Sequence, residues 1–245
     1  MPGPLTVVGR RPALEAVRSG RATEVLVARG ARSTSALREL VEAAGVLDVP
    51  VLTVPGERIE SLADGALHQG VAARVNPPPR LAEADLSARD WAGDSVVMVI
   101  DGVTDPHNLG ALARTAEAAG AEALITRRRR SAHLEKVALK ASAGALLHLP
   151  AAQVANIPRA LGLLKEAGFW VVGLDGSAGK TVFEEAPPGK IALVLGAEGE
   201  GLSRLVREKC DELLAIPLRG KVASLNVSVA AGVAVFSYAV RGKER

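Results

Sequence analysis

The stretch Val96-Val97-Met98-Val99-Ile100-Asp101-Gly102 places an unbroken apolar run directly before a polar loop. Such a run suits a strand that is buried on both faces of a sheet. Similar runs recur at Trp170–Leu174 and Ile191–Leu195, with helical patterns between them. Because buried strands that alternate with helices form parallel sheets, the sequence predicts an α/β fold with helices on both faces.

The alternation continues through the second part of the chain, from Ser95 to Arg245. Further strands are expected at Ala123–Ile125 and Leu213–Ile216. The expected helices are Leu109–Ala119, His133–Ala141, Asn156–Ala167, Ser203–Lys209 and Val227–Val240.

The first part, residues 1–76, is expected to be a separate α/β module. Its predicted helices are Arg11–Ser19, Ser35–Ala44 and Glu57–Ala63, and its predicted strands are Glu24–Ala28, Val49–Val54 and Gly70–Val75. The prolines of Asn76–Pro79 then halt helices and strands alike, because proline lacks the backbone donor. We therefore expect a linker over 77–94 and a second domain over 95–245.

The composition is that of an ordinary globular chain. Of 245 residues, 48% are hydrophobic and 23% are charged, which excludes wholesale disorder, collagen-like repeats and coiled coil. Only 2% are aromatic, so a stacking platform for single-stranded nucleic acid is not expected. The single cysteine, Cys210, excludes an internal disulfide framework. No apolar stretch marks export or a membrane span, so we expect a soluble, cytoplasmic protein without a membrane partner.

Arginine is unevenly distributed along the chain. Residues 1–32 hold six arginines against two acidic residues, and Arg127 to Arg130 form an unbroken run. Clustered positive charge attracts phosphate groups, although a solvated arginine-rich surface explains the clusters equally well.

Three loops carry the residues that are able to do chemistry, because ligands bind beyond the carboxyl ends of the strands in a doubly wound sheet. The first loop follows Ile100 and contains Asn108, with Arg114 in the helix behind it. Asn108 suits a helix N-cap, and Arg114 suits an ion pair with Glu117. Alternatively, Arg114 lies in the second turn, near the helix start and away from the apolar face, and grips a phosphate beside the N-terminal amides.

The second loop is rich in glycine. Gly196, Gly199 and Gly201 follow the strand that ends at Leu195, and glycine lets backbone approach a ligand closely. The spacing matches neither a dinucleotide-binding fingerprint nor a Walker loop. Glu198 in this loop either accepts hydrogen bonds from a ligand or caps the next helix.

The third loop runs from Ile216-Pro217 to Ser224-Leu225-Asn226 and enters a helix of small residues. Ser224 and Asn226 suit helix capping. No metal site is expected, because metal-ligand spacing with Cys or acids is absent around the four histidines, His68, His107, His133 and His148.

Together the three loops resemble the signature motifs of the SpoU family of ribose 2′-O-methyltransferases, within the SPOUT superfamily. Asn108-Leu109-Gly110-Ala111-x-x-Arg114 is similar to the first motif and Leu195-Gly196-x-Glu198-x-x-Gly201 to the second. Ile216-Pro217 with Ser224-Leu225-Asn226-Val227-Ser228 is similar to the third.

Two other regions extend the resemblance. Val8-Gly9 and Asp64-Gly65-x-x-His68-Gln69-Gly70 are similar to the small ribosomal-protein-like RNA-binding domain that precedes the catalytic domain in this family. The segment Arg130–Leu134 resembles the corresponding segment in the branch of the family that modifies a guanosine of large-subunit ribosomal RNA.

The resemblance implies a parallel SPOUT sheet with a C-terminal deep trefoil knot, a homodimer, and S-adenosyl-L-methionine held among the three loops. The implied reaction is methyl transfer to the ribose 2′-hydroxyl of a guanosine in 23S rRNA. The implied cofactor-binding residues are Leu195, Gly196, Gly201, Ile216, Pro217 and Leu225. The implied catalytic group is Asn108, Arg114, Glu198, Ser224 and Asn226.

Arg114 is expected to act as a phosphate clamp beside the attacked ribose. A guanidinium has a pKa above about 12 and gives up its proton reluctantly, so a role as proton acceptor would depend on that contact. A tRNA methyltransferase of the same family and a non-catalytic ribosome-assembly factor are the alternatives. A Rossmann methyltransferase is not favoured, because Asp101–His107 lacks the glycine-rich loop it requires.

Overall fold

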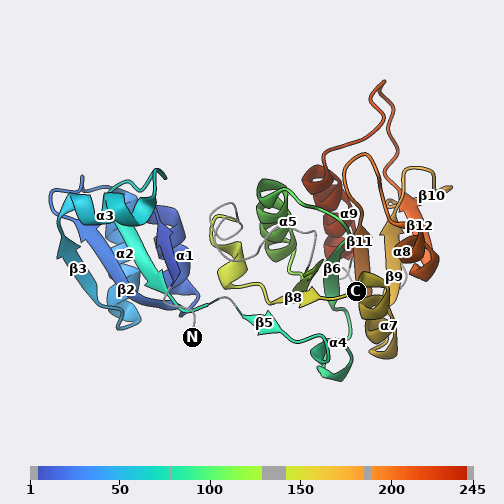
Figure 1. The fold of residues 1–245 in the computed structure, drawn as a ribbon, viewed down its shortest axis with the longest axis horizontal. Helices are drawn as coiled ribbons and strands as arrows, with labels where there is room; N and C mark the ends of the chain where they lie inside the picture. The colour runs from blue at the N-terminus through green and yellow to red at the C-terminus, as the bar shows by residue number, and fades with distance from the viewer. Residues whose placement is uncertain (1–4, 78, 129–141, 185–188, 242–245) are drawn as a thin grey trace.

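The computed structural model describes residues 5–77, 79–128, 142–184 and 189–241, which form two lobes (Figure 1). The expected helix at His133–Ala141 and two residues of the arginine run, Arg129 and Arg130, lie outside the described residues.

The smaller lobe is a four-stranded sheet with helices on both faces. Its strands, in the spatial order β1-β4-β2-β3, are β1 (Leu5–Val8), β4 (Val71–Val75), β2 (Ala22–Ala28) and β3 (Val51–Val54). β4 is antiparallel to both of its neighbours, whereas β2 and β3 are parallel. One face packs against α1 (Arg10–Arg18) and α2 (Ser35–Val46), and the other against α3 (Gly56–Ala63).

The larger lobe is built on an eight-stranded sheet whose described strand pairs are all parallel, as the sequence predicts. The spatial order is β10-β12-β9-β11-β6-β7-β8-β5. In chain order the strands are β5 (Arg80–Leu81), β6 (Val96–Ile100), β7 (Ala123–Arg127), β8 (Ala151–Val154), β9 (Trp170–Leu174), β10 (Lys180–Thr181), β11 (Ile191–Leu195) and β12 (Glu212–Ala215). The two edge strands, β10 and β5, are two residues long.

Alternate residues of each strand face opposite layers of helices. Met98 and Ile100 of β6 join a buried cluster with α5 (Pro106–Ala118), α9 (Val227–Arg241) and the 3-10 turn η1 (Ala145–Leu147). Val97 and Val99 join a second cluster with α4 (Asp85–Ala88), α7 (Ile157–Glu166) and α8 (Arg204–Lys209). Among the described residues, no helix is long and apolar enough to cross a membrane.

Most of the stretch expected to be a linker packs into the larger lobe. Arg80 and Leu81 form β5, which pairs with β8. Leu86 and Trp91 are buried, and the Trp91 ring meets Phe169 edge-on with 5.3 Å between centroids. The expectation of a linker over 77–94 therefore fails from Arg80 onward, because apolar side chains in this polar stretch complete the second core.

Candidate active site

A cavity of about 260 Å³ opens at the carboxyl ends of β9, β11 and β12, where a parallel sheet is expected to bind its ligand. Of the expected cofactor-binding residues, five line the cavity and Pro217 does not; the five are Leu195, Gly196, Gly201, Ile216 and Leu225. Of the expected catalytic group, Glu198 and Ser224 line it, whereas Asn108, Arg114 and Asn226 do not.

The glycine-rich loop is a closed turn. The Gly201 amide donates to the Ala197 carbonyl at 2.9 Å. A Cβ on Gly196 would lie 2.0 Å from the carbonyl carbon of Gly201, so no larger residue fits there. Gly199 and Gly201 have φ of 81° and 68°, the left-handed region that favours glycine. The turn therefore requires glycine at several positions, for close packing and for backbone conformation.

Asp101 ties this turn to the neighbouring strands. Its backbone amide donates to the Leu195 carbonyl at 2.8 Å. Its carboxylate, which is 4% exposed, accepts from the Ser203 amide at 3.0 Å and lies 3.4 Å from the Arg127 guanidinium. One buried side chain thus joins the ends of β6 and β7 to the start of α8.

Asn226 brings the three loops together. Its side-chain nitrogen donates to Asn108 Oδ1 at 3.1 Å and reaches Glu198 Oε2 at 3.5 Å. Its side-chain oxygen accepts from the amide of Ser228 at 2.9 Å and from the hydroxyl at 2.6 Å, which caps α9 as expected. The Glu198 carboxylate is therefore a partner of Asn226. The alternative expectation that Glu198 caps α8 is wrong, because Ser203 holds the N-cap position.

Three expectations for the first loop are wrong. The N-cap of α5 is Asp105, whose carboxylate accepts from the His107 amide, so Asn108 lies inside the first turn. The helix starts at Pro106, which places Arg114 in its third turn, away from the N-terminal amides. Arg114 is exposed and pairs neither with Glu117 nor with another described residue. Its guanidinium is therefore available to an external anion.

The loop after β9 also lines the cavity, although the sequence predicts a site only at the loops after β6, β11 and β12. Leu174, Asp175 and Gly176 line the cavity together with the glycine turn. The Ser177 hydroxyl donates to Asp175 at 2.6 Å, and this bond lowers the pKa of the carboxyl, assisted by Arg207 at 2.5 Å. The sequence signal for this part of the cavity is Trp170–Leu174, a predicted parallel strand. Its carboxyl end lies at the same edge of the sheet as those of the other parallel strands, where the ligand is expected to bind.

The cavity suits a ligand that is partly apolar and positively charged. Side chains of Leu195, Leu214 and Val227 supply a dry wall of the kind that an adenine ring requires. The charged residues that line the cavity in the described structure are two acids, Asp175 and Glu198. S-adenosyl-L-methionine, with an adenosyl group and a sulfonium cation, fits this combination.

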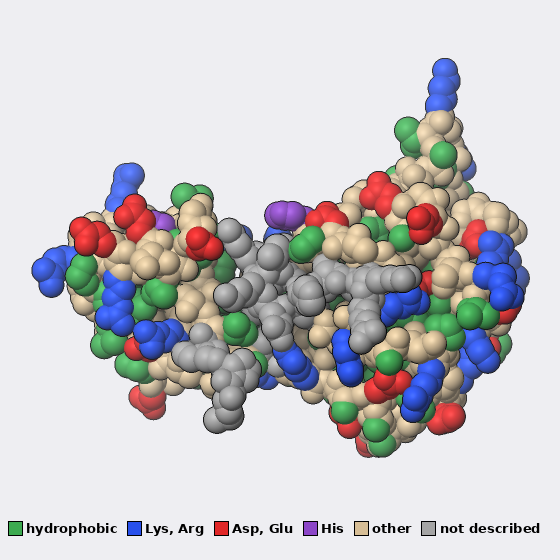
Figure 2. Space-filling view, in the orientation of Figure 1, with side chains coloured by type: hydrophobic (Ala, Val, Ile, Leu, Met, Phe, Trp, Pro, Cys, Tyr) green, Lys and Arg blue, Asp and Glu red, His purple; other side chains and the backbone are tan. Residues whose placement is uncertain are grey.

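The third loop extends well beyond the cavity. In Figure 1 it projects from the larger lobe between β12 and α9, and Figure 2 shows Lys and Arg side chains at its tip. Arg219 and Lys221 are exposed, whereas Ile216 and Leu225 at the base line the cavity. One loop thus presents an apolar base to the pocket and a basic tip to solvent.

Two family models match the chain. The model of the SpoU rRNA Methylase family covers residues 95–236, and the model described as RNA 2′-O ribose methyltransferase substrate binding covers residues 6–81.

Curated relatives match over most of their own length. The 23S rRNA (guanosine-2′-O-)-methyltransferase RlmB of Salmonella typhimurium is 43% identical over 217 residues, covering 88% of this chain and 89% of that protein. The protein of the same name from Yersinia pestis is 44% identical over 220 residues, covering 88% of each.

Solved structures share the fold. The SpoU methyltransferase AviRb from Streptomyces viridochromogenes, in complex with the cofactor AdoMet, has a TM-score of 0.77 at 26% identity and covers 98% of this chain and 91% of its own. The A. aeolicus TrmH/SpoU tRNA modifying enzyme has a TM-score of 0.52 at 26% identity, covering 66% of this chain and 81% of its own. With a family model spanning most of the larger lobe and relatives matched over nearly their whole length, the chain belongs to the SpoU rRNA methylase family.

Proposed function

We propose that this enzyme transfers a methyl group from S-adenosyl-L-methionine to the ribose 2′-hydroxyl of a specific guanosine in 23S rRNA. The observation that carries the proposal is the set of hydrogen bonds by which Asn226 links Asn108 to Glu198, which lines the pocket. The relatives from Salmonella and Yersinia, which bear the matching activity in their names, support the choice of substrate.

The pocket residues orient the reactants, since alignment of oxygen, carbon and sulfur is the main requirement of such a transfer. When bound, S-adenosyl-L-methionine supplies an electrophilic methyl group on a cationic sulfur. Glu198 gives the pocket a negative charge that favours this cation, whereas the charge of Asp175 is balanced by Arg207. Asn226 occupies the side-chain oxygen of Asn108, which leaves the Asn108 amide group to donate to the target nucleotide. Ser224 and Leu225 shape the wall beside it.

Arg114 holds the phosphate next to the attacked ribose. Its guanidinium is exposed and has no partner among the described residues, so RNA meets no competing ion pair there. A planar fork matches two phosphate oxygens at once, which a lysine ammonium does not do.

Residues 1–76 act as the RNA-binding domain. Arg10 is used internally, because it donates to the Arg32 carbonyl at 2.8 Å and to Gln69 at 3.3 Å. The exposed guanidinium groups of Arg11, Arg29 and Arg32 have no partner in the described part of the chain. Together with Arg38 and Arg58, which are likewise exposed and without a side-chain partner among the described residues, these side chains are available to phosphates.

The larger lobe is knotted and pairs with a second copy of the chain. Support for the knot comes from the chain segment after β12. Asn226 of this segment donates to Asn108 of the first loop, and the chain then enters α9, which packs against α5. Support for the pairing comes from Val229 and Phe236 of α9, which are 51% and 42% exposed. We propose a cytoplasmic location, since the named relatives are 23S rRNA methyltransferases.

The test is methyl transfer from labelled S-adenosyl-L-methionine to 23S rRNA fragments, with tRNA as the competing substrate. We expect one labelled guanosine in the rRNA and none in tRNA; label in tRNA alone or in neither RNA overturns the proposal.

The Arg114→Lys variant tests the clamp in the same assay. We expect turnover on saturating RNA to fall by about a hundredfold, because the forked contact is lost. The Kd for S-adenosyl-L-methionine, measured by calorimetry, should stay unchanged since Arg114 is outside the pocket. Near-normal turnover would show that the fork is unnecessary.

A further inference from the structure

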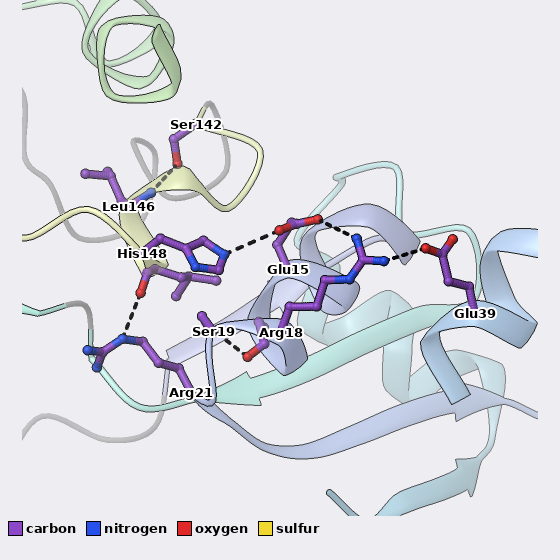
Figure 3. Close-up of polar contacts among 10 residues, drawn as sticks. Glu15, Arg18, Ser19, Arg21, Glu39, Ser142, Leu146 and His148 are labelled. Carbon is purple, nitrogen blue, oxygen red and sulfur yellow. Dashed lines mark hydrogen bonds and ion pairs between the residues drawn. The ribbon is translucent and has the colours of Figure 1, made fainter. Parts of the chain in front are cut away.

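The two lobes meet at a seam between α1 and the region around η1, which Figure 3 shows in close-up. On the side of the smaller lobe lie Glu15, Arg18 and Arg21, and on the side of the larger lobe lie Leu147 and His148. Apolar residues of both sides, among them Val17 and Leu147, belong to one buried cluster. The seam is thus a packed contact with a polar margin.

Arg21 joins three segments of the chain. Its Nε donates to the Leu147 carbonyl of the larger lobe at 2.8 Å, and its Nη1 donates to the Pro77 carbonyl of the connecting segment at 2.8 Å. Its own carbonyl accepts from the Asn76 amide at 2.9 Å. A rigid guanidinium that bonds two carbonyls in separate segments fixes their relative position.

Glu15 strengthens the same seam. Its carboxylate lies 3.3 Å from His148 and 3.5 Å from Arg18, which in turn donates to Glu39 at 2.6 Å. Gly144, with φ of 97°, allows this approach, because a Cβ there would lie 2.8 Å from the Cβ of Glu15. The two surfaces therefore fit closely in one arrangement.

The seam leads directly to the helix that carries the first motif. η1 packs against α1 on one side and against α5 on the other. α5 contains Asn108 and Arg114, which the proposed function places at the target nucleotide. The position of the smaller lobe is thus set relative to the reacting end of the enzyme.

We infer that Arg21 is a positioning residue that locks the smaller lobe onto η1 and so determines which nucleotide of a bound RNA reaches the pocket. The inference rests on the proposed function. An RNA-binding domain on a loose tether would present several nucleotides in turn, because interfaces between domains permit motion unless they are held. A fixed seam presents one nucleotide at one distance from Arg114.

The test compares Arg21→Met with Arg29→Met in the full-length enzyme. Both variants lose one arginine of the smaller lobe, but only Arg21 bonds the larger lobe. We expect Arg21→Met to raise the KM for RNA about tenfold, the equivalent of the lost carbonyl bonds, and to spread methylation to neighbouring nucleotides. The KM for S-adenosyl-L-methionine should stay unchanged. Arg29→Met should raise the KM for RNA by no more than about threefold and keep a single methylated position.

Two further readings keep the outcomes separate. Small-angle scattering should show a wider spread of lobe separations in Arg21→Met than in wild type or Arg29→Met, whatever the activity. Arg21→Lys, which keeps the charge but cannot span both carbonyls, replaces the Met variant if that variant does not fold. A single methylated position and an unchanged scattering profile in the Arg21 variants would overturn the inference. Inactive wild-type enzyme would instead count against the proposed function.

Discussion

Polar side chains of the loops around the pocket are bonded within the protein, whereas several exposed arginines have no side-chain partner among the described residues. Asp101, Glu198 and Asn226 are bonded to other loops within the protein. Arg114 and Arg29 have no side-chain partner among the described residues. The difference teaches that the proposed cofactor site is held together within the protein, whereas the arginines are free to make the RNA contacts that the proposed function gives them.

Replacing Gly196 by Ala should have the largest effect, because it disrupts the glycine-rich turn that lines the pocket. The new Cβ would fall 2.0 Å from the backbone of Gly201, which no side-chain adjustment relieves. We expect the affinity for S-adenosyl-L-methionine, measured by calorimetry, to drop by at least about a hundredfold. Gly220→Ala, in the exposed part of the third loop and with open space around its Cβ, is the control and should bind normally. Equal affinity in the two variants would contradict the closed turn.

Asp101→Ala should have the next largest effect. It leaves the Ser203 amide and the Arg127 guanidinium without their buried partner. We expect a loss of about 3 kcal/mol in the free energy of unfolding and about a tenfold weaker affinity for S-adenosyl-L-methionine. Urea unfolding and calorimetry measure the two quantities, with Asp105→Ala as a control that removes an exposed cap. Unfolding energy lost with no change in affinity would limit Asp101 to a structural role.

The smallest effect is expected at Cys210, the residue that follows α8. Burial raises the pKa of its thiol from an ordinary value of 9.0 to about 11. Above pH 9 the unfolded chain releases this proton while the folded chain keeps it, so folding loses stability as pH rises through that window. Urea unfolding between about pH 8 and about pH 10 should show a shallower decline in Cys210→Ala than in wild type. Parallel declines would mean that the thiol ionises equally in both states.

The sheet was predictable from the sequence because its central strands are apolar without interruption. Val96–Ile100 and Ile191–Leu195 are found within the expected bounds. β5, β8 and β10 were missed, since β5 and β10 have two residues each and the polar Gln153 interrupts the short apolar run of β8. Trp91 was assigned to a linker because the surrounding residues are polar and only the fold shows that its ring is buried.

The candidate site was predictable where motifs carry it and not where distant residues meet. Asn226 was expected both to cap its helix and to shape the site, yet its bond to Asn108 spans 118 positions. Asp101 was read only as part of a loop, because its partner Ser203 lies 102 positions away. Local patterns report helix ends, whereas such bonds arise only when strands of the sheet are placed side by side.

The sheet ends on both sides in a strand of two residues, β10 and β5. Each offers very few unpaired backbone groups to a neighbouring molecule, so a broad parallel sheet avoids growing by addition of foreign strands. The short edge strands therefore limit edge-to-edge association of this sheet.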